Sequence, residues 1–291
     1  MILAAHEAPY TLFVEDDDYP MNPREDCDPF GKMVCWHRRY SLGDKHQYDD
    51  PEDFLRDLYR KSVDDNAKRL ISFLKSGKAR GARLEYNRHT HEWELYTYWC
   101  LRTIIGDSKP RWDLESSAPK SQLNDGGWFF DDMLNALTID DLKELLGERE
   151  DLVILPLFLY DHSMLSMSIG SFLGRAVHAE WDSGQVGYTY ADREEIQKNY
   201  GAVNKETVKK AEEVLEAEVE SYDMYLRGEC YGFRLYKDGE EEDSCWGFLG
   251  DVDDMLKELP SYLPEECAGL IGRLEECDDS EEAYLMEHMP A

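Results

Sequence analysis

The sequence is short of basic residues. Its 291 residues include 32 Lys and Arg against 63 Asp and Glu, which gives a formal net charge of −31 at pH 7. The surplus acid is spread along the chain rather than confined to one tail. Such a charge repels nucleic acids and anionic lipids over about 8–10 Å in ordinary salt, and it attracts cationic surfaces. We therefore expect no direct nucleic-acid binding and no membrane binding, and the composition favours a basic protein surface as the partner.

The motifs of common cofactor and metal chemistry are also missing. There is no G-x-x-x-x-G-K-[ST] phosphate loop, no G-x-G-x-x-G after a strand, and no C-x-x-C pair. The acidic runs EDDD and GDVDD do not follow the spacing of a calcium-binding loop. The Cys and His residues between 27 and 46 lack zinc spacing, and His89 with His91 would supply only two ligands. We expect no cofactor and no metal site.

Long apolar runs are absent too. The longest, LVILPLFLY, has nine residues and contains a proline, which is far too short to span a membrane. The opening residues MILAAHEAPYTLF have neither the basic start nor the long apolar core of a signal peptide. The seven cysteines are an odd number, so reduced thiols in a cytoplasm are the expected state.

Apolar residues are nevertheless plentiful. They make up 42% of the chain, with 18 Tyr, 10 Phe and 7 Trp, so we expect a folded globular protein rather than a disordered acidic tail. Three explanations of the charge stay open. The charge could serve solubility, including growth in high salt; it could bind cations; or it could imitate a nucleic-acid backbone for a basic protein groove. The abundance of cysteine and aromatic residues disfavours salt adaptation.

Hydrophobic periodicity and turn signals predict an α+β fold, with a mixed or antiparallel sheet and flanking helices. Strands are predicted at 10–15, 32–42, 82–104, 151–163, 185–191 and 230–237, and the turn Asp238-Gly239 joins the last to a following strand. Helices are predicted at 51–77, 138–148, 192–201, 204–228, 252–259 and 264–277. Residues 107–128 have the composition of a long loop. We expect an N-terminal part at 1–106, a loop or boundary at 107–130, and a C-terminal part at 131–291, or one continuous domain.

The clearest element is a long acidic amphipathic helix at 204–228. Asn204 is its expected cap and Gly228 its end. Its apolar positions step by three or four residues and form one stripe, made of Val208, Ala211, Leu215, Val219, Tyr222 and Leu226. Carboxylates three or four residues apart on a helix lie roughly 5–6 Å apart, whereas phosphates recur about every 3.4 Å along a DNA strand. Such a helix can present a row of charge to a basic groove; the alternative is an ordinary solvated face.

The predicted partner-binding residues are therefore carboxylates. On the helix they are Glu212, Glu213, Glu216, Glu220 and Asp223. A second acidic patch, at Asp16, Asp17 and Asp18, follows the strand predicted at 10–15.

A hydrolase or nuclease is the alternative that the segments YDHS and WDSG raise. Asp161, His162, Asp182 and Ser183 supply the residue types of a catalytic triad, with or without a divalent ion. However, DSG precedes a strand and does not sit in a G-x-S-x-G nucleophile elbow.

The architectural interpretation of the same residues is favoured. It makes Asp182-Ser183-Gly184 a turn with the glycine at positive φ, Trp181 packed beneath it, and Gly187 a point of close backbone approach. We therefore predict no catalytic residue.

Several stretches resemble one family. ILPLFLYDHSMLSMS, WDSGQVGYTY, the acidic helix through ESYDMYLRGECYGFRLY, and DSCWGFLGD resemble soluble proteins encoded by tailed phages and integrated mobile elements. DPFGKMVCWHRRYSLGDKH, near the start of the chain, is similar to the opening segment of that family. The likeness covers most of the chain, and it implies no activity and no catalytic residue. It implies a phage accessory protein in the host-cell cytoplasm, a setting in which small acidic proteins often block CRISPR or restriction effectors.

The combined prediction is a non-enzymatic inhibitor. It would dock on the basic groove of a host nucleic-acid-targeting defence complex, CRISPR–Cas or restriction, by imitating nucleic acid. The remaining alternative is a virion or replication accessory protein whose acidity only maintains solubility.

Overall fold

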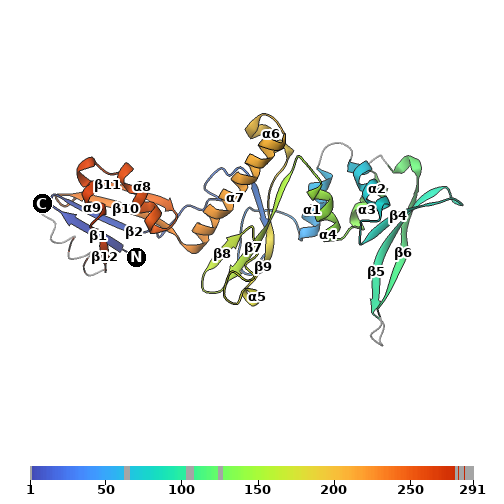
Figure 1. The fold of residues 1–291 in the computed structure, drawn as a ribbon, viewed down its shortest axis with the longest axis horizontal. Helices are drawn as coiled ribbons and strands as arrows, with labels where there is room; N and C mark the ends of the chain where they lie inside the picture. The colour runs from blue at the N-terminus through green and yellow to red at the C-terminus, as the bar shows by residue number, and fades with distance from the viewer. Residues whose placement is uncertain are drawn as a thin grey trace. The chain divides into compact units, whose positions relative to one another are not determined.

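A computed structural model describes residues 2–61, 66–102, 108–123 and 127–278, together with 281 and 285 (Figure 1). The chain forms two compact units, and each is assembled from separated segments. Unit 1 consists of Met1–Asp44, Leu155–Ala191 and Lys210–Ala291, and unit 2 consists of Lys45–Ile154 and Asp192–Lys209.

The first sheet of unit 1 joins the two ends of the chain. Its antiparallel strands follow the order β11-β10-β2-β1-β12. They are β1 (Ile2–Glu7), β2 (Tyr10–Asp16), β10 (Cys230–Lys237), β11 (Glu240–Leu249) and β12 (Glu275–Cys277).

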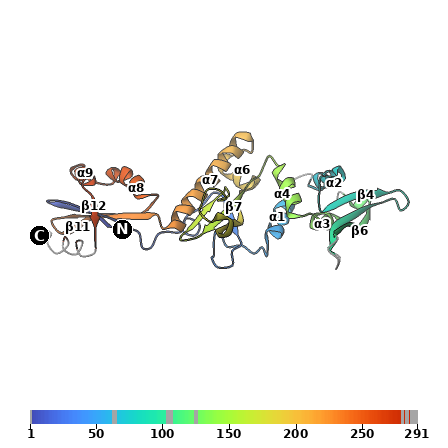
Figure 2. The same cartoon turned by 60° about the horizontal axis from the view of Figure 1, so that its bottom comes forward.

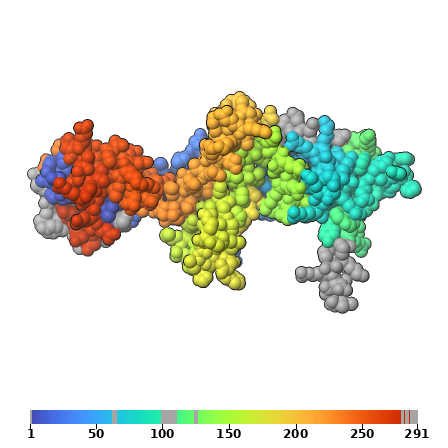
Figure 3. Space-filling model, viewed as in Figure 1, coloured from blue at the N-terminus to red at the C-terminus, as the bar shows by residue number. Residues whose placement is uncertain are grey.

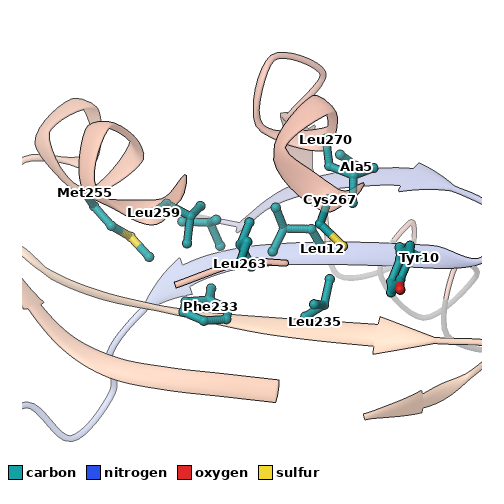
Figure 4. Packing of buried hydrophobic residues seen from close by; sticks show 11 residues of the cluster. Ala5, Tyr10, Leu12, Phe233, Leu235, Met255, Leu259, Leu263, Cys267 and Leu270 are labelled. Atoms are coloured by element: carbon teal, nitrogen blue, oxygen red, sulfur yellow. The ribbon is translucent and has the colours of Figure 1, made fainter. Parts of the chain in front are cut away.

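One face of this sheet is covered by helices. Alternate side chains of β2 and β10, such as Leu12 and Phe233, are fully buried there because successive residues of a strand point to opposite faces. They pack with Met255 of α8 (Val252–Glu258), with Leu259 of the 3-10 helix η2 (Leu259–Ser261), and with Leu270 of α9 (Ala268–Ile271) (Figure 4). Figure 2 shows α8 and α9 on this face of the sheet. Between η2 and α9 lies the 3-10 helix η3 (Glu265–Cys267).

The second sheet of unit 1 has the order β3-β9-β7-β8. Its strands are β3 (Lys32–Cys35), β7 (Val153–Asp161), β8 (Leu165–Ser168) and β9 (Ser183–Ala191), and the short helix α5 (Ala179–Asp182) runs directly into β9. The long helix α7 (Lys205–Arg227) packs on this sheet, with Val219 and Tyr222 in one buried cluster with Met33, Leu157 and Leu159.

Unit 2 holds a three-stranded antiparallel sheet and helices. The strands β4 (Ala82–Asn87), β5 (Glu92–Arg102) and β6 (Ser108–Pro119) lie in that order, and β6 leads into the 3-10 helix η1 (Lys120–Gln122). The helices are α1 (Pro51–Arg60), α2 (Asn66–Ser76), α3 (Trp128–Asn135), α4 (Ile139–Gly147) and α6 (Arg193–Tyr200). Helix α2 packs on β4, α3 on β6, and α1 against α4.

The predicted α+β class, the antiparallel sheets and the long helix are confirmed. The local signals also hold. The side-chain oxygen of Asn204 accepts from the backbone N–H groups of Glu206 and Thr207, as a helix cap does. Thr138 and Asp141 form a capping box at the start of α4. The turn between β10 and β11 places Asp238 at φ 50° and Gly239 at φ 86°, as a tight hairpin requires.

The predicted loop at 107–128 is wrong for the residues that the structure describes there, 108–123 and 127–128; residues 107 and 124–126 lie outside the described part. Residues Ser108–Pro119 form β6, which pairs along its length with β5, and Trp128 begins α3. The Ser and Pro residues that suggested a loop are tolerated because β6 is the edge strand of its sheet. Local composition cannot show that a partner strand lies alongside.

Other predicted elements are divided differently. The stretch predicted as a strand at 82–104 is, up to Arg102, a hairpin of β4 and β5, with His91 in the turn at φ 61° and with 103–104 outside the described residues. The stretch 51–77 contains two helices, α1 and α2, with 62–65 outside the described residues. The strand expected at 32–42 ends at Cys35. The helix expected at 264–277 is broken, and Glu275–Cys277 instead pairs with β1.

Candidate functional site

Most acids of α7 lie on the side of the helix that faces away from the core. The helix belongs to the orange segment in the middle of Figure 3. Glu212, Glu213 and Glu220 are exposed and Glu216 is half-buried. Between Lys210 and Arg227 the helix carries acids and no base. Glu212, Glu216 and Glu220 recur every four residues, and we call them the α7 stripe.

The opposite face of α7 is anchored. Ala211, Leu215, Val219 and Tyr222 are buried, and the Tyr222 hydroxyl accepts from the backbone N–H of Gly43 at 3.1 Å. Burial raises the pKa of Tyr222, so the phenol stays neutral. The helix is therefore a fixed support for the carboxylates on its outer side.

A buried arginine ties the segment after β2 to the same helix. The Arg24 guanidinium donates to both carboxylate oxygens of Asp44, at 2.9 and 2.8 Å, and to Glu218 at 3.2 Å. Burial alone would lower the pKa of Arg24, but Asp44 and Glu218 outweigh it and the pKa is raised. Glu218 also accepts from the backbone N–H groups of Phe30 and Gly31. Sequence reasoning missed this cluster because its members are distant in the chain.

Asp223 differs from the other predicted partner-binding acids. It accepts from the Ser166 hydroxyl at 2.8 Å and from the backbone N–H of Met167 at 2.6 Å, and it forms an ion pair with Arg227 at 3.2 Å. Its side chain is only 18% exposed. The carboxylate holds β8 against α7, and its acceptor capacity is largely occupied within the protein.

A crevice of about 280 Å³ lies between α7 and the β8 region. Glu216, Glu220 and Asp223 line it from the helix, and two cations line it as well: Arg227 from the helix and Arg175 from the segment that follows β8. Its charge is therefore mixed, and the strongly anionic part of α7 is the outer surface with Glu212 and Glu213.

The second acidic patch borders a cavity at the end of β2. Asp16 and Asp18 are exposed and Asp17 is half-buried. Asp17 accepts from the backbone N–H of Tyr19 at 2.9 Å, and the Cys230 thiol lies 3.8 Å from its other carboxylate oxygen. The three aspartates line the cavity together with Trp246 of β11. Sequence reasoning found the acids but not the indole, which is 230 positions away from Asp16 in the chain.

The YDHS and WDSG segments do come together in part. The Nδ1 atom of His162 lies 2.8 Å from a carboxylate oxygen of Asp182, in an exposed position beside the ring of His178. Asp161 instead pairs with Arg39 at 2.5 Å and faces the Tyr40 hydroxyl at 3.4 Å. The Ser183 hydroxyl donates to the backbone carbonyl of Ala179 at 2.6 Å. The result is a His–Asp pair whose neighbouring serine is turned into the backbone, not a triad.

The predicted architecture of this segment is only partly right. Gly187 is a point of close approach, because a Cβ there would lie 2.1 Å from the Val34 carbonyl oxygen. Trp181 does not pack beneath the turn, since it is 83% exposed on the one-turn helix α5. The positive φ belongs to His178, at 57°, the N-cap residue of the one-turn helix α5, and not to Gly184.

Among the described residues, no three His, Cys, Asp or Glu side chains are arranged to hold a metal ion. In that part of the chain, no helix is both long and apolar enough to cross a membrane. No family model, no curated protein and no solved structure matches the chain. The resemblance to phage-encoded proteins therefore stays a prediction.

Proposed function

We propose that this protein is a non-enzymatic inhibitor that docks on a cationic protein groove through its anionic side chains. The expected partner is a host nucleic-acid-targeting defence complex, of the CRISPR–Cas or restriction kind. The expected setting, from the resemblance noted above, is a phage or mobile element acting in the host cytoplasm.

The observation that carries the proposal is the α7 stripe with Glu213. These carboxylates are held on a helix whose opposite face is buried. Because the helix backbone is already fixed, binding of a partner costs little entropy for ordering it. Asp16, Asp17 and Asp18 supply a second anionic surface. The net charge of −31 adds attraction at a distance towards any basic groove.

The size of the stripe sets the scale of the imitation. Eight residues of helix rise about 12 Å, which is the length of three or four phosphates along one DNA strand. The stripe therefore fits a short basic patch that normally grips a few phosphates, rather than a groove that follows a long duplex.

Charge reversal on α7 tests the proposal. Purified guide-RNA effector complexes and restriction endonucleases are assayed for DNA binding with the protein added, at 50 and 300 mM NaCl. We expect the wild type to displace DNA from at least one of them, less well at high salt. Glu212→Lys/Glu216→Lys/Glu220→Lys should weaken inhibition at least about 100-fold, since each reversed contact costs on the order of 1 kcal/mol or more.

A matched control carries the same charge change elsewhere in unit 1. Glu240→Lys/Glu242→Lys/Glu258→Lys alters three other exposed acids and should inhibit nearly as well as the wild type. If both triple variants lost inhibition equally, the effect would depend on net charge and not on the position of the α7 stripe. Inhibition that ignores salt would contradict docking by charge.

The His162–Asp182 pair supports a second candidate function, general acid–base catalysis in a hydrolase or nuclease. A carboxylate 2.8 Å from Nδ1 fixes the imidazole and leaves Nε2 for a substrate or water. His162→Ala decides between the two. Inhibition lost in a folded variant, with Asp182→Asn matching it, favours chemistry; unchanged inhibition favours the surface mechanism.

A further inference from the structure

The cavity at the end of β2 has a volume of about 460 Å³ and an unusual lining. It is formed by Glu15, Asp16, Asp17, Asp18, Tyr19, Met21, Trp246 and Gly247. Four of these residues are acids, two are aromatic, and none is cationic. The cavity therefore combines negative charge with an aromatic wall, and, unlike the crevice beside α7, it has no cation in its lining.

The aromatic wall is held in place. Trp246 pairs with Gly232 across β10 and β11, and a Cβ on Gly232 would lie 2.1 Å from Cε3 of the indole. The six-membered ring thus rests on the glycine, while the side chain as a whole is 44% exposed. Gly247, at φ 89°, and the register shift beside Gly232 redirect the strand here, as β-bulges do. One side of the indole is seated on the sheet and the other is available to a ligand.

The carboxylates are not equivalent. Glu15 is neutralised by Arg234, whose Nε lies 2.6 Å from it. Within the described part of the chain, neither Asp17 nor Asp18 forms an ion pair. Asp17 is instead oriented by the Tyr19 N–H, and its own N–H donates to the Cys230 carbonyl at 2.8 Å. The cavity therefore has a surplus of anionic oxygens on a fixed backbone.

Neighbouring groups reflect this negative potential. The pKa of the Cys230 thiol is raised to about 11, first by burial and then by the charge of Asp17. Burial raises the pKa of Tyr231 as well, with Asp16, Glu229 and Asp251 adding to it. A cation entering the cavity would relieve this accumulation of charge.

A guanidinium group fits both features. It is planar, stacks on an aromatic face, and donates two parallel hydrogen bonds to a carboxylate. An ammonium is a strongly hydrated point charge that cannot stack in this way. A quaternary ammonium is held by a cage of several aromatic rings, whereas the aromatic wall of this cavity consists mainly of one ring system, the indole of Trp246.

We propose that this cavity binds the guanidinium group of an arginine side chain presented by the partner protein. The inference deepens the proposed function and rests on it, because it names the group on the basic surface that the acidic patch recognises. The indole of Trp246 would stack on the guanidinium plane, and Asp17 and Asp18 would accept its hydrogen bonds.

The test uses a small probe and needs no partner. The full-length protein, with ¹⁵N in its tryptophan indoles, is titrated with N-acetyl-arginine amide, and the Trp246 indole signal is assigned by its loss in Trp246→Phe. We expect a saturable shift with a Kd in the millimolar range, because one stacked and hydrogen-bonded cation supplies only a few kcal/mol. N-acetyl-lysine amide and tetramethylammonium should bind at least about fivefold more weakly.

Variants locate the site. Asp17→Asn/Asp18→Asn should weaken arginine-amide binding at least about fivefold, read by calorimetry. So should Gly232→Ala, which keeps every ligand-contacting side chain but displaces the indole. The matched controls Glu240→Gln/Glu242→Gln and Trp181→Ala, which alter exposed residues outside the cavity, should leave the Kd unchanged. Circular dichroism verifies that each variant is folded. If the double variant does not fold, the single variant Asp18→Asn, at an exposed position, replaces it in the test.

Several results would overturn the inference. These are a shift that does not saturate, equal affinity for arginine and lysine, tighter binding of tetramethylammonium, or wild-type affinity in the cavity variants. Because the probe is free in solution, the cavity can fail while the α7 stripe still inhibits a defence complex. Conversely, if the cavity bound arginine but the protein inhibited no defence complex, the cavity would be an arginine site and the proposed function would be wrong.

Discussion

Single carboxylates in this protein have different tasks despite their shared charge. Glu212 and Glu213 are exposed, whereas Asp223 joins β8 to α7 and Asp141 holds a turn. Asp141 is 1% exposed and accepts from the backbone N–H groups of Arg80, Gly81 and Thr138 at 2.7, 3.0 and 3.1 Å. Burial opposes its ionisation, but these three donors outweigh burial, and the pKa of Asp141 is lowered.

Asp141→Asn should therefore destabilise unit 2 by about 2 kcal/mol at pH 7, because an amide nitrogen would face backbone donors. A folded-state pKa below the unfolded one means that the wild-type contribution is complete above pH of about 4 and disappears as the pH falls further. Urea unfolding at pH 7 and pH 3 measures both effects, and the difference between the two proteins should shrink at the lower pH. The control is Glu144→Gln, which changes an exposed neighbour. If Asp141→Asn were as stable as the wild type at pH 7, the role given to Asp141 would be contradicted.

At the scale of elements, close backbone approach decides where strands can pair. β3 lies against β9 at Gly187, whose partner in register is Cys35. A Cβ at 187 would meet the Val34 oxygen at 2.1 Å and the Cys35 Cα at 2.9 Å, both backbone atoms that cannot move aside. Cys35, the residue paired with Gly187, has a buried thiol whose pKa burial raises to about 12.

Gly187→Ala should cost about 2–3 kcal/mol of unfolding free energy through overpacking between β3 and β9. Gly184→Ala is the matched control on the same strand, since nothing lies within 4 Å of a Cβ there. Thermal unfolding should show a clear fall for position 187 and little change for 184. A second readout is thiol labelling, because loosening of this contact should expose Cys35 to alkylation. If the two variants were equally stable, close approach of β3 would not be what requires a glycine at position 187.

For the whole molecule, the charge that favours a basic partner also opposes folding. Acids outnumber bases by 63 to 32, so the compact state brings like charges together. Salt screens this self-repulsion and also screens attraction to a cationic groove.

Raising NaCl from 20 to 300 mM should therefore increase the melting temperature by several degrees while it weakens inhibition of the partner. Calorimetry and the DNA-displacement assay measure the two effects on one preparation. The stripe variant with three lysines, which has a smaller negative charge, should show a smaller rise in melting temperature. A fall in melting temperature on adding NaCl would show that self-repulsion does not limit stability.

The sequence by itself determined what depends on neighbours along the chain. Spacings of three and four residues fixed the amphipathic helix α7, and Asn204, Thr138 with Asp141, and Asp238-Gly239 marked helix starts and a hairpin. These signals are reliable because caps and turns are satisfied within a few residues. The charge balance is likewise a property of composition alone.

Only the tertiary structure decided which distant residues meet. It paired Ser108–Pro119 with β5. It placed His162 beside Asp182 but directed the Ser183 hydroxyl to the backbone. It made Asp223 accept a hydrogen bond from the backbone of β8. It also brought Trp246 to the cavity that Asp16, Asp17 and Asp18 line. The reason is physical: strand pairing, burial and the seating of a side chain on a glycine are satisfied by partners far along the chain, which local patterns do not record.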